Sequence, residues 1–261
     1  MVLKNMDEAQ MTWPQGDKFV ELESLVVERH PLLIGAFGVV DGLKIPVQVS
    51  YTDDEMENAT YNEWLHEHFI NNVLAFSPKG VIIACTLNAP GSWHDSSVAR
   101  PIYDKLLNHT PDGYYLVADT AFPRGADSIS GKIWAPVKDG THLRQAAQAR
   151  QQLLDFDNEL LSFRQAAEWG MQTMQGSFGC LHVPMKAGDH EGGGDSLEIC
   201  FRLFNLCARC IGYNQIRSVY MPIWVVNEQE QIWKDFENVV FGEQRRQDRV
   251  RRFYLDQGSV V

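Results

Sequence analysis

The sequence lacks any apolar run long enough to cross a bilayer, and Met1 to Asp17 contain neither the basic start nor the apolar stretch of a secretion signal. Cysteine is also sparse. The five cysteines are an odd number, and their spacings do not suggest a disulfide framework. These absences exclude a membrane protein and a disulfide-stapled secreted domain. We therefore expect a soluble protein of a reducing, intracellular compartment.

Basic residues are few as well: 23 Lys and Arg stand against 34 Asp and Glu, for a net charge of −11. Affinity for phosphate backbones comes largely from Lys and Arg, so the surface as a whole is not a nucleic-acid binder and any DNA contact must be local or assisted. A local excess occurs near the C-terminus. This cluster consists of Arg245, Arg246, Arg249, Arg251 and Arg252. The favoured interpretation is a solvated helix face, and the alternative is a nuclear-import or phosphate-contacting patch.

The 261 residues, 44% of them apolar, are enough for one large α/β core. Apolar periodicity and turn residues predict a mixed central sheet with helices on both faces. The expected elements are a helix at 17–30, strands at 36–40 and 45–49, a loop at 51–60, a hairpin of strands 73–76 and 81–87, a helix at 94–107, strands at 114–118 and 132–137, a long helix at 142–174, and a helix capped by Asp195. The expected domains are a helical lead-in at 1–35, a main domain at 36–220 and a helical tail at 221–261.

Two acidic residues stand where apolar strands are predicted to end: Asp41 after 36–40 and Asp119 after 114–118. Ligands of α/β sheets bind at strand ends, and neighbouring strands can bring the two carboxylates together. A third acid, Glu168, lies inside the long predicted helix, which can aim it at the same point. The alternative is that both aspartates are turn residues and that Glu168 is only a surface partner of Arg164, four residues before it.

Three carboxylates held close together repel one another unless a cation lies between them. Oxygen-only ligands suit Mg²⁺ or Mn²⁺ better than Zn²⁺. A pair of such ions activates an attacking hydroxyl and stabilises a leaving oxygen, which is the equipment of phosphodiester chemistry.

Five stretches, in this order along the chain, resemble the DDE superfamily endonuclease domain of Harbinger-type transposases. They are Val39-Val40-Asp41-Gly42-Leu43-Lys44-Ile45; Tyr61-Asn62 with Trp64-Leu65-His66; Leu87-Asn88-Ala89-Pro90-Gly91-Ser92-Trp93-His94-Asp95-Ser96; Ala118-Asp119-Thr120-Ala121-Phe122-Pro123; and Arg164-Gln165-Ala166-Ala167-Glu168-Trp169-Gly170 with Gln175-Gly176-Ser177-Phe178-Gly179.

The resemblance implies a ribonuclease-H-like fold and a catalytic, metal-binding triad of Asp41, Asp119 and Glu168 with Mg²⁺ or Mn²⁺. It also implies DNA as substrate, a nuclear location and a separate DNA-binding protein as partner. His94 and Asp95 stand beside the triad in this pattern: we expect Asp95 to favour a helix N-terminus and His94 to have a structural role near the site.

Two other function classes stay open. The chain can be a domesticated or decayed copy that serves as a binding module, which the acidic charge and the lack of basic residues after the glutamate favour. A phosphohydrolase of small substrates is the third class, and it requires an enclosed pocket.

Overall fold

The computed structural model describes residues 2–49, 54–123, 129–137, 147–212 and 214–221. The helical tail predicted for 221–261, with its arginine cluster, lies outside the described residues except for Met221. The domain boundaries predicted near residues 35 and 220 stay predictions. In the part of the chain that the structure describes, no helix is long and apolar enough to span a membrane.

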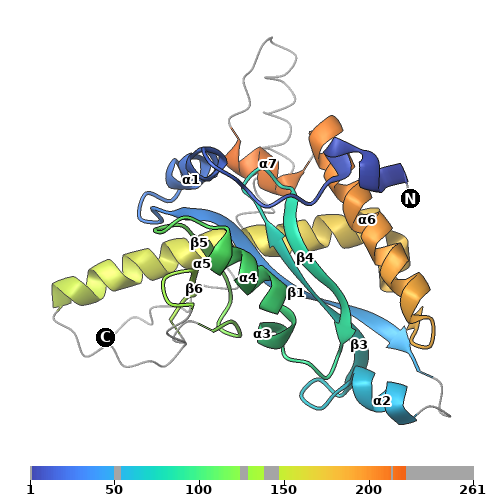
Figure 1. Cartoon of the computed structure of the whole chain (residues 1–261). Helices are drawn as coiled ribbons and strands as arrows, with labels where there is room; N and C mark the ends of the chain where they lie inside the picture. Colours follow the sequence, from blue (N-terminus) through green and yellow to red (C-terminus); the bar gives the residue numbers. More distant parts are fainter. Residues whose placement is uncertain (1, 50–53, 124–128, 138–146, 213, 222–261) are drawn as a thin grey trace, which may run out of the picture. The chain divides into compact units, whose positions relative to one another are not determined.

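Seven strands form one mixed sheet in the order β2-β3-β1-β5-β6, with β4 paired to β3 and β7 paired to β1 (Figure 1). The central strand β1 runs antiparallel to β3 and parallel to β5 and β7. The strands are β1 (Ala36–Gln48), β2 (Tyr61–Asn62), β3 (Glu67–Phe76), β4 (Ile82–Pro90), β5 (Tyr115–Val117), β6 (Ile133–Trp134) and β7 (Met185–Lys186). The mixed α/β sheet expected from the sequence is confirmed.

Helices cover both faces of this sheet. Successive residues of a strand point to opposite faces, so β1 contributes side chains to a core on each side. On one face, Val39 and Ile45 pack with Phe163 of α5, and in Figure 1 this long helix crosses behind the strands. On the other face, Val40 packs in a second core with Ile102 of α4. The helices are α1 (Lys18–Val27), α2 (Asp54–Thr60), α3 (Asp95–Val98), α4 (Arg100–Asn108), α5 (Ala147–Ser177), α6 (His190–Cys210) and α7 (Gln215–Tyr220), with short 3₁₀ helices at Val2–Asn5, Asp7–Ala9 and Gly179–His182.

The strand that carries Asp41 is longer than the sequence suggests. The prediction of two strands, with Asp41 at the end of the first, was wrong, because β1 continues unbroken from Ala36 to Gln48. The reason is long-range pairing: β3 is in register with β1 from Val39 to Pro46 and supplies a hydrogen-bonding edge past Asp41. What ends near Asp41 is the parallel neighbour β5, whose last pair with β1 joins Val117 to Val39.

Two further local predictions were wrong. The stretch 51–60 was expected to be a loop, but its described part forms α2. The first turn of α2 carries Asp54, Glu55 and Glu57, whose negative charges stabilise the helix by interacting with the positive end of its dipole. The last long helix, α6, begins at His190 instead of Asp195 because Asp189 caps it, accepting the Gly192 N–H at 3.1 Å.

The other elements follow the prediction closely. The β3–β4 hairpin, the buried strand β5 and the helix α1 form as expected. The crossover helix of 94–107 is divided into α3 and α4, since Pro101 at the start of α4 favours a new helical start. The strand expected at 132–137 is reduced to Ile133–Trp134, and the described part of the long helix extends three residues further, to Ser177.

Candidate active site

The structure places Asp41 and Asp119 next to each other at the edge where β1 and β5 separate. These strands are parallel, and each aspartate lies two residues beyond the last paired residues, Val39 and Val117. Backbone N–H groups orient both carboxylates: Gly42 donates to Asp41 Oδ1 and Ala121 donates to Asp119 Oδ1, each at 2.8 Å. The adjacency expected for the two aspartates is therefore present in the fold.

The carboxyl group of Asp41 lies in an electrostatically unfavourable position. Burial raises its pKa from the ordinary 3.8 to about 6, and the neighbouring carboxylates of Asp119 and Asp95 act in the same direction. The Gly42 N–H and the Arg164 guanidinium oppose this rise without cancelling it. Asp41 is thus a buried anion with less positive charge near it than it needs, which is the condition that a bound cation relieves.

Helix α5 brings Glu168 and Arg164 to the same face of the sheet as Asp41. Arg164 Nη2 donates to Glu168 Oε1 at 2.9 Å, one helical turn away, and Arg164 Nη1 lies 3.9 Å from Asp41 Oδ2. The guanidinium therefore stands between the two carboxylates. Glu168 is paired with Arg164, as the alternative interpretation expected. Arg164 also contacts Asp41 and so connects the two acids.

Asp95 approaches the site from the opposite side of β1. A Cβ added at Gly42 would lie 2.7 Å from Asp95 Oδ2, so this close approach requires glycine. Asn71 of β3 fixes the carboxylate by donating to Asp95 Oδ1 at 2.6 Å, and the buried Oδ1 of Asn71 has no hydrogen-bond partner among the described residues.

His94 contributes to the start of helix α3. It precedes α3, and its Nδ1 accepts the Ser96 N–H at 3.3 Å, which caps the helix. Asp95 is the first residue of this helix and its carboxylate instead faces Asn71 and Gly42.

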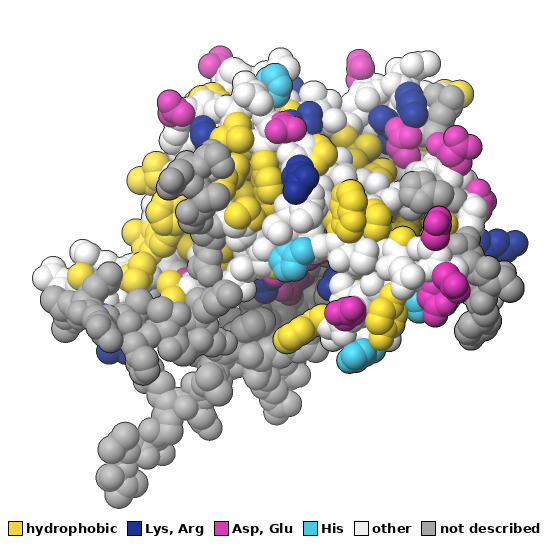
Figure 2. Space-filling model, turned by 60° about the horizontal axis from the view of Figure 1, so that its bottom comes forward, with side chains coloured by type: hydrophobic (Ala, Val, Ile, Leu, Met, Phe, Trp, Pro, Cys, Tyr) yellow, Lys and Arg dark blue, Asp and Glu magenta, His cyan; other side chains and the backbone are white. Residues whose placement is uncertain are grey.

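The chemistry of these donors suits a divalent ion, although the side chains are not gathered around one point. Among the described residues, no three His, Cys, Asp or Glu side chains lie close enough together to hold a metal ion. Asp41 and Asp119 offer neighbouring oxygen ligands of the kind that Mg²⁺ and Mn²⁺ accept. Glu168 can join them only if its carboxylate turns away from Arg164. Figure 2, which brings the lower end of Figure 1 forward, shows acidic and basic side chains meeting in a hollow of the surface.

A family model described as DDE superfamily endonuclease matches residues 40–205, which is more than half of the chain. The match begins one residue before Asp41 and includes Asp119 and Glu168. The chain belongs to this family. No match was found among curated proteins or among solved structures.

The family match indicates a transposase-like nuclease domain, and the description of the family as endonucleases implies DNA as the substrate class. The mixed sheet flanked by helices is consistent with a ribonuclease-H-like fold. Domains of this family generally use divalent metals, which agrees with the oxygen donors of Asp41 and Asp119.

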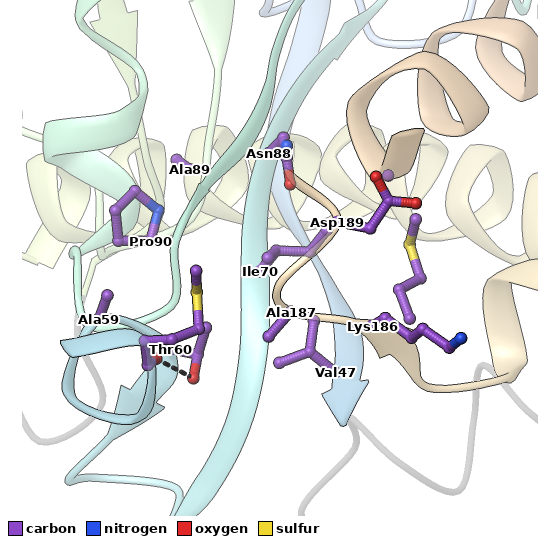
Figure 3. Close-up of a pocket in the computed structure, with 13 residues that line it drawn as sticks. Val47, Ala59, Thr60, Ile70, Asn88, Ala89, Pro90, Lys186, Ala187 and Asp189 are labelled. Atoms are coloured by element: carbon purple, nitrogen blue, oxygen red, sulfur yellow. Dashed lines mark hydrogen bonds between the residues drawn. The ribbon is translucent and has the colours of Figure 1, made fainter. Parts of the chain in front are cut away.

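A separate pocket lies between the sheet and the start of α6 (Figure 3). Its lining includes Val47, Ile70 and Ala89, and Lys186 and Asp189 lie at its polar side, whereas Asp41, Asp119 and Glu168 do not line it. Its volume of about 50 Å³ is far below that of typical small-molecule sites, at about 300 Å³ or more. Two larger hollows, of about 390 and 540 Å³, are not lined by Asp41, Asp119 or Glu168 either. These pockets therefore give no support to a phosphohydrolase of small substrates that uses the three acids.

Sequence reasoning missed two parts of the site. It treated Arg164 only as a local partner of Glu168, because a spacing of four residues is visible in the sequence whereas the contact with Asp41 crosses between α5 and β1. It gave no role to Asn71, which with Asn72 forms a pair of consecutive amides among the apolar residues of β3. An unexplained polar residue in such a strand was the available signal.

Proposed function

We propose that the chain is the catalytic core of a divalent-metal-dependent DNA endonuclease of the Harbinger-type transposase branch. Asp41, Asp119 and Glu168 are its catalytic residues. The observation that carries the proposal is that Arg164 lies between Asp41 and Glu168, while Asp119 adjoins Asp41. The membership of the chain in a DDE endonuclease family supports this assignment of the three acids.

In this proposal Asp41 and Asp119 hold Mg²⁺ or Mn²⁺, and Glu168 completes the ligand set. A bound divalent ion supplies activation of an attacking water or 3′-hydroxyl and stabilisation of the leaving oxygen. The backbone N–H groups of Gly42 and Ala121 orient the two aspartates. Arg164 balances part of the negative charge of Asp41 and Glu168 until Glu168 turns, and its guanidinium is then available to a DNA phosphate.

The partners and the location follow from the same proposal. The net charge of −11 limits the affinity that this chain can have for DNA by itself, so we propose a separate DNA-binding protein as partner. A nuclear location would give both proteins access to DNA.

The direct test is nicking of supercoiled plasmid by the purified chain in Mg²⁺ or Mn²⁺, compared with Asp41→Asn, Asp119→Asn and Glu168→Gln. We expect cation-dependent nicking by the wild type and none by the three variants. The control is Asp104→Asn, which removes an exposed carboxylate from α4 and should leave nicking unchanged.

Binding of Mn²⁺ by titration calorimetry gives a second readout that does not depend on turnover. Nicking that persists in Asp41→Asn would contradict the assigned ligands. A folded wild type that binds DNA but nicks nothing would contradict the nuclease proposal and leave the binding module as the function.

A further inference from the structure

Two tryptophans protrude into solvent from two loops that are hydrogen-bonded to each other. Trp64, at the tip of the β2–β3 hairpin, is 89% exposed, and Trp93, in the turn between β4 and α3, is 53% exposed. Large aromatic side chains gain stability from burial, so their exposure at neighbouring loops indicates a surface that contacts something else. Both loops lie at the lower end of Figure 1, near α2 and α3, and Figure 2 shows this end from the front.

The hairpin tip is held in a defined conformation and attached to the turn. Asn62 Oδ1 accepts the N–H groups of Trp64 at 3.2 Å and Leu65 at 3.1 Å, which fixes the tip. The Nδ2 of the same side chain donates to Gly91 O at 3.0 Å and so joins the hairpin to the turn that carries Trp93.

The turn is packed closely enough to require its glycine. A Cβ at Gly91 would lie 2.1 Å from Phe69 O, so the backbone of the turn rests directly on β3. Ser92 N–H also donates to Ala59 O at 3.1 Å, from the end of α2. Trp64 and Trp93 are therefore presented by a rigid base.

One buried amide connects this surface to the acids. Asn71 Nδ2 donates to Trp93 O at 3.1 Å and to Asp95 Oδ1 at 2.6 Å, and Asp95 in turn lies against Gly42, the residue after Asp41. The position of Trp93 is thus fixed relative to the strand that carries the first proposed metal ligand.

The charges around the two rings favour contact with a base over contact with a duplex backbone. Exposed Glu63 and Glu67 flank Trp64 and repel phosphates from the hairpin tip. One cation is close by: Lys44 lies opposite Asn71 in the β1–β3 register, and its Nζ lies 5.3 Å from the centroid of the Phe69 ring. Lys44 has no carboxylate partner among the described residues.

We infer that Trp64, Trp93 and Lys44 form a binding site for unpaired nucleotides of the DNA held at the acidic site, with bases stacked on the tryptophans and a phosphate on Lys44. Paired bases inside a duplex expose no ring face, so stacking selects nucleotides that have left the helix. The inference rests on the proposed function, because it takes the occupant to be the DNA that the acids cut.

The test measures DNA binding in EDTA, where no cleavage can occur. Two oligonucleotides of equal length are compared, one a full duplex and one with three unpaired bases that include 2-aminopurine as a fluorescent reporter of stacking. We expect the wild type to prefer the unpaired DNA and to quench the reporter. Base stacking on an aromatic ring contributes about 1–3 kcal/mol, so Trp64→Ala and Trp93→Ala should each weaken this binding roughly 5- to 150-fold.

Three variants separate stacking from a structural effect. Trp64→Phe and Trp93→Phe keep a ring and should keep most of the affinity, and Lys44→Ala should lower the salt dependence of binding. Ile34→Ala is the matched control, because Ile34 is 70% exposed in the loop before β1, at the other end of that strand from Lys44.

Equal affinity for both oligonucleotides, no DNA binding, or unchanged binding in both Trp→Ala variants would overturn the inference. A change of oligomeric state in those variants without a change in DNA binding would make the surface an interface between copies, and would overturn it as well. Plasmid nicking is assayed separately: a chain that nicks DNA but fails here refutes only the tryptophan site. A chain that succeeds here but nicks nothing refutes the proposed nuclease.

Discussion

Arg164 Nη1 lies 3.9 Å from Asp41 Oδ2, a contact between the middle of α5 and the middle of β1. Both side chains are about four-fifths buried, so this pair is screened less by solvent than a surface ion pair is. The same guanidinium holds Glu168 at 2.9 Å. Four predictions follow from this arrangement and from the packing around it.

Replacing Arg164 with Ala should destabilise the metal-free protein and increase its response to metal. Without the guanidinium, Asp41 and Glu168 lose their shared positive neighbour, at a cost of about 2 kcal/mol in the free energy of unfolding. Added Mg²⁺ should then raise the Tm more in Arg164→Ala than in the wild type, measured by thermal unfolding at pH 7.5. The control is Arg150→Ala, which removes an exposed arginine from the same helix. An equal Mg²⁺ response in wild type and Arg164→Ala would contradict this role.

Asp41→Asn should stabilise the metal-free protein at neutral pH and not under acidic conditions. The pKa of Asp41 is about 6 in the folded protein, above its ordinary 3.8, so folding takes up a proton between these values. The stability contributed by protonated Asp41 is complete below pH 4 and is lost as the pH rises through 6. A shift of about 2 pH units corresponds to about 3 kcal/mol, which the amide should recover at pH 7.5.

Urea denaturation of wild type and Asp41→Asn at pH 7.5 and pH 4 measures this difference. Asp104→Asn, at an exposed position, should change little at either pH. Equal effects of Asp41→Asn at the two pH values would refute the charge explanation.

Gly42→Ala should destabilise the fold and disturb the acidic site at once. The added Cβ would lie 2.7 Å from Asp95 Oδ2, so Asp95 must leave its position beside Asn71, at a cost of about 1–3 kcal/mol. Combining Gly42→Ala with Asp95→Ala should cost less than the sum of the two single changes, as measured by a double-mutant cycle in urea. Gly176→Ala in α5 is the counterpart: nothing lies within 4 Å of its Cβ, and the protein should gain about 0.5–1 kcal/mol. Additive effects of Gly42→Ala and Asp95→Ala would show that the contact between them has no energetic importance.

Asn205→Ala should be among the more damaging changes away from the acids. This fully buried side chain of α6 accepts the Ile82 N–H at 2.7 Å and donates to Ile82 O at 2.8 Å and Gln10 O at 2.9 Å. Its loss leaves buried backbone groups of β4 unpaired, which should cost about 3 kcal/mol in chemical denaturation. Asn108→Ala, at the exposed end of α4, should cost far less. A similar small loss for both variants would contradict the importance of this connection.

The local pattern of apolar and turn residues was enough to predict most helices and strands. It failed where contacts with distant parts of the chain determine where an element begins or ends. The β3–β4 hairpin was predicted because its turn residues lie between two apolar stretches. The continuation of β1 past Asp41 was not, because the pairing of Asp41 with Leu74 depends on a strand more than twenty residues away. In α6, the glycines at 192–194 obscured the first helical turns, and the Asp189 cap overcame their low helix propensity.

The candidate site divides in the same way. Asp41 and Asp119 follow apolar stretches, and this pattern was enough to suggest that neighbouring strands bring their carboxylates together. Glu168 was placed by its resemblance to the glutamate of the family, since nothing in the periodicity of α5 separates it from other polar residues. The closeness of Asp95 to Gly42 and the exposure of Trp64 could be found only from the structure.

The pairing of β1 with β3 determines which side chains of the candidate site can move. Asp41 is carried by a strand whose register with β3 runs from Val39 to Pro46, so backbone displacement there would break the hydrogen bonds to β3. Glu168 has a flexible side chain, 40% exposed, on the surface of a helix. Adapting the ligand set therefore requires rotation about a few bonds of the Glu168 side chain, a motion that takes nanoseconds or less for exposed groups and leaves the strands in place.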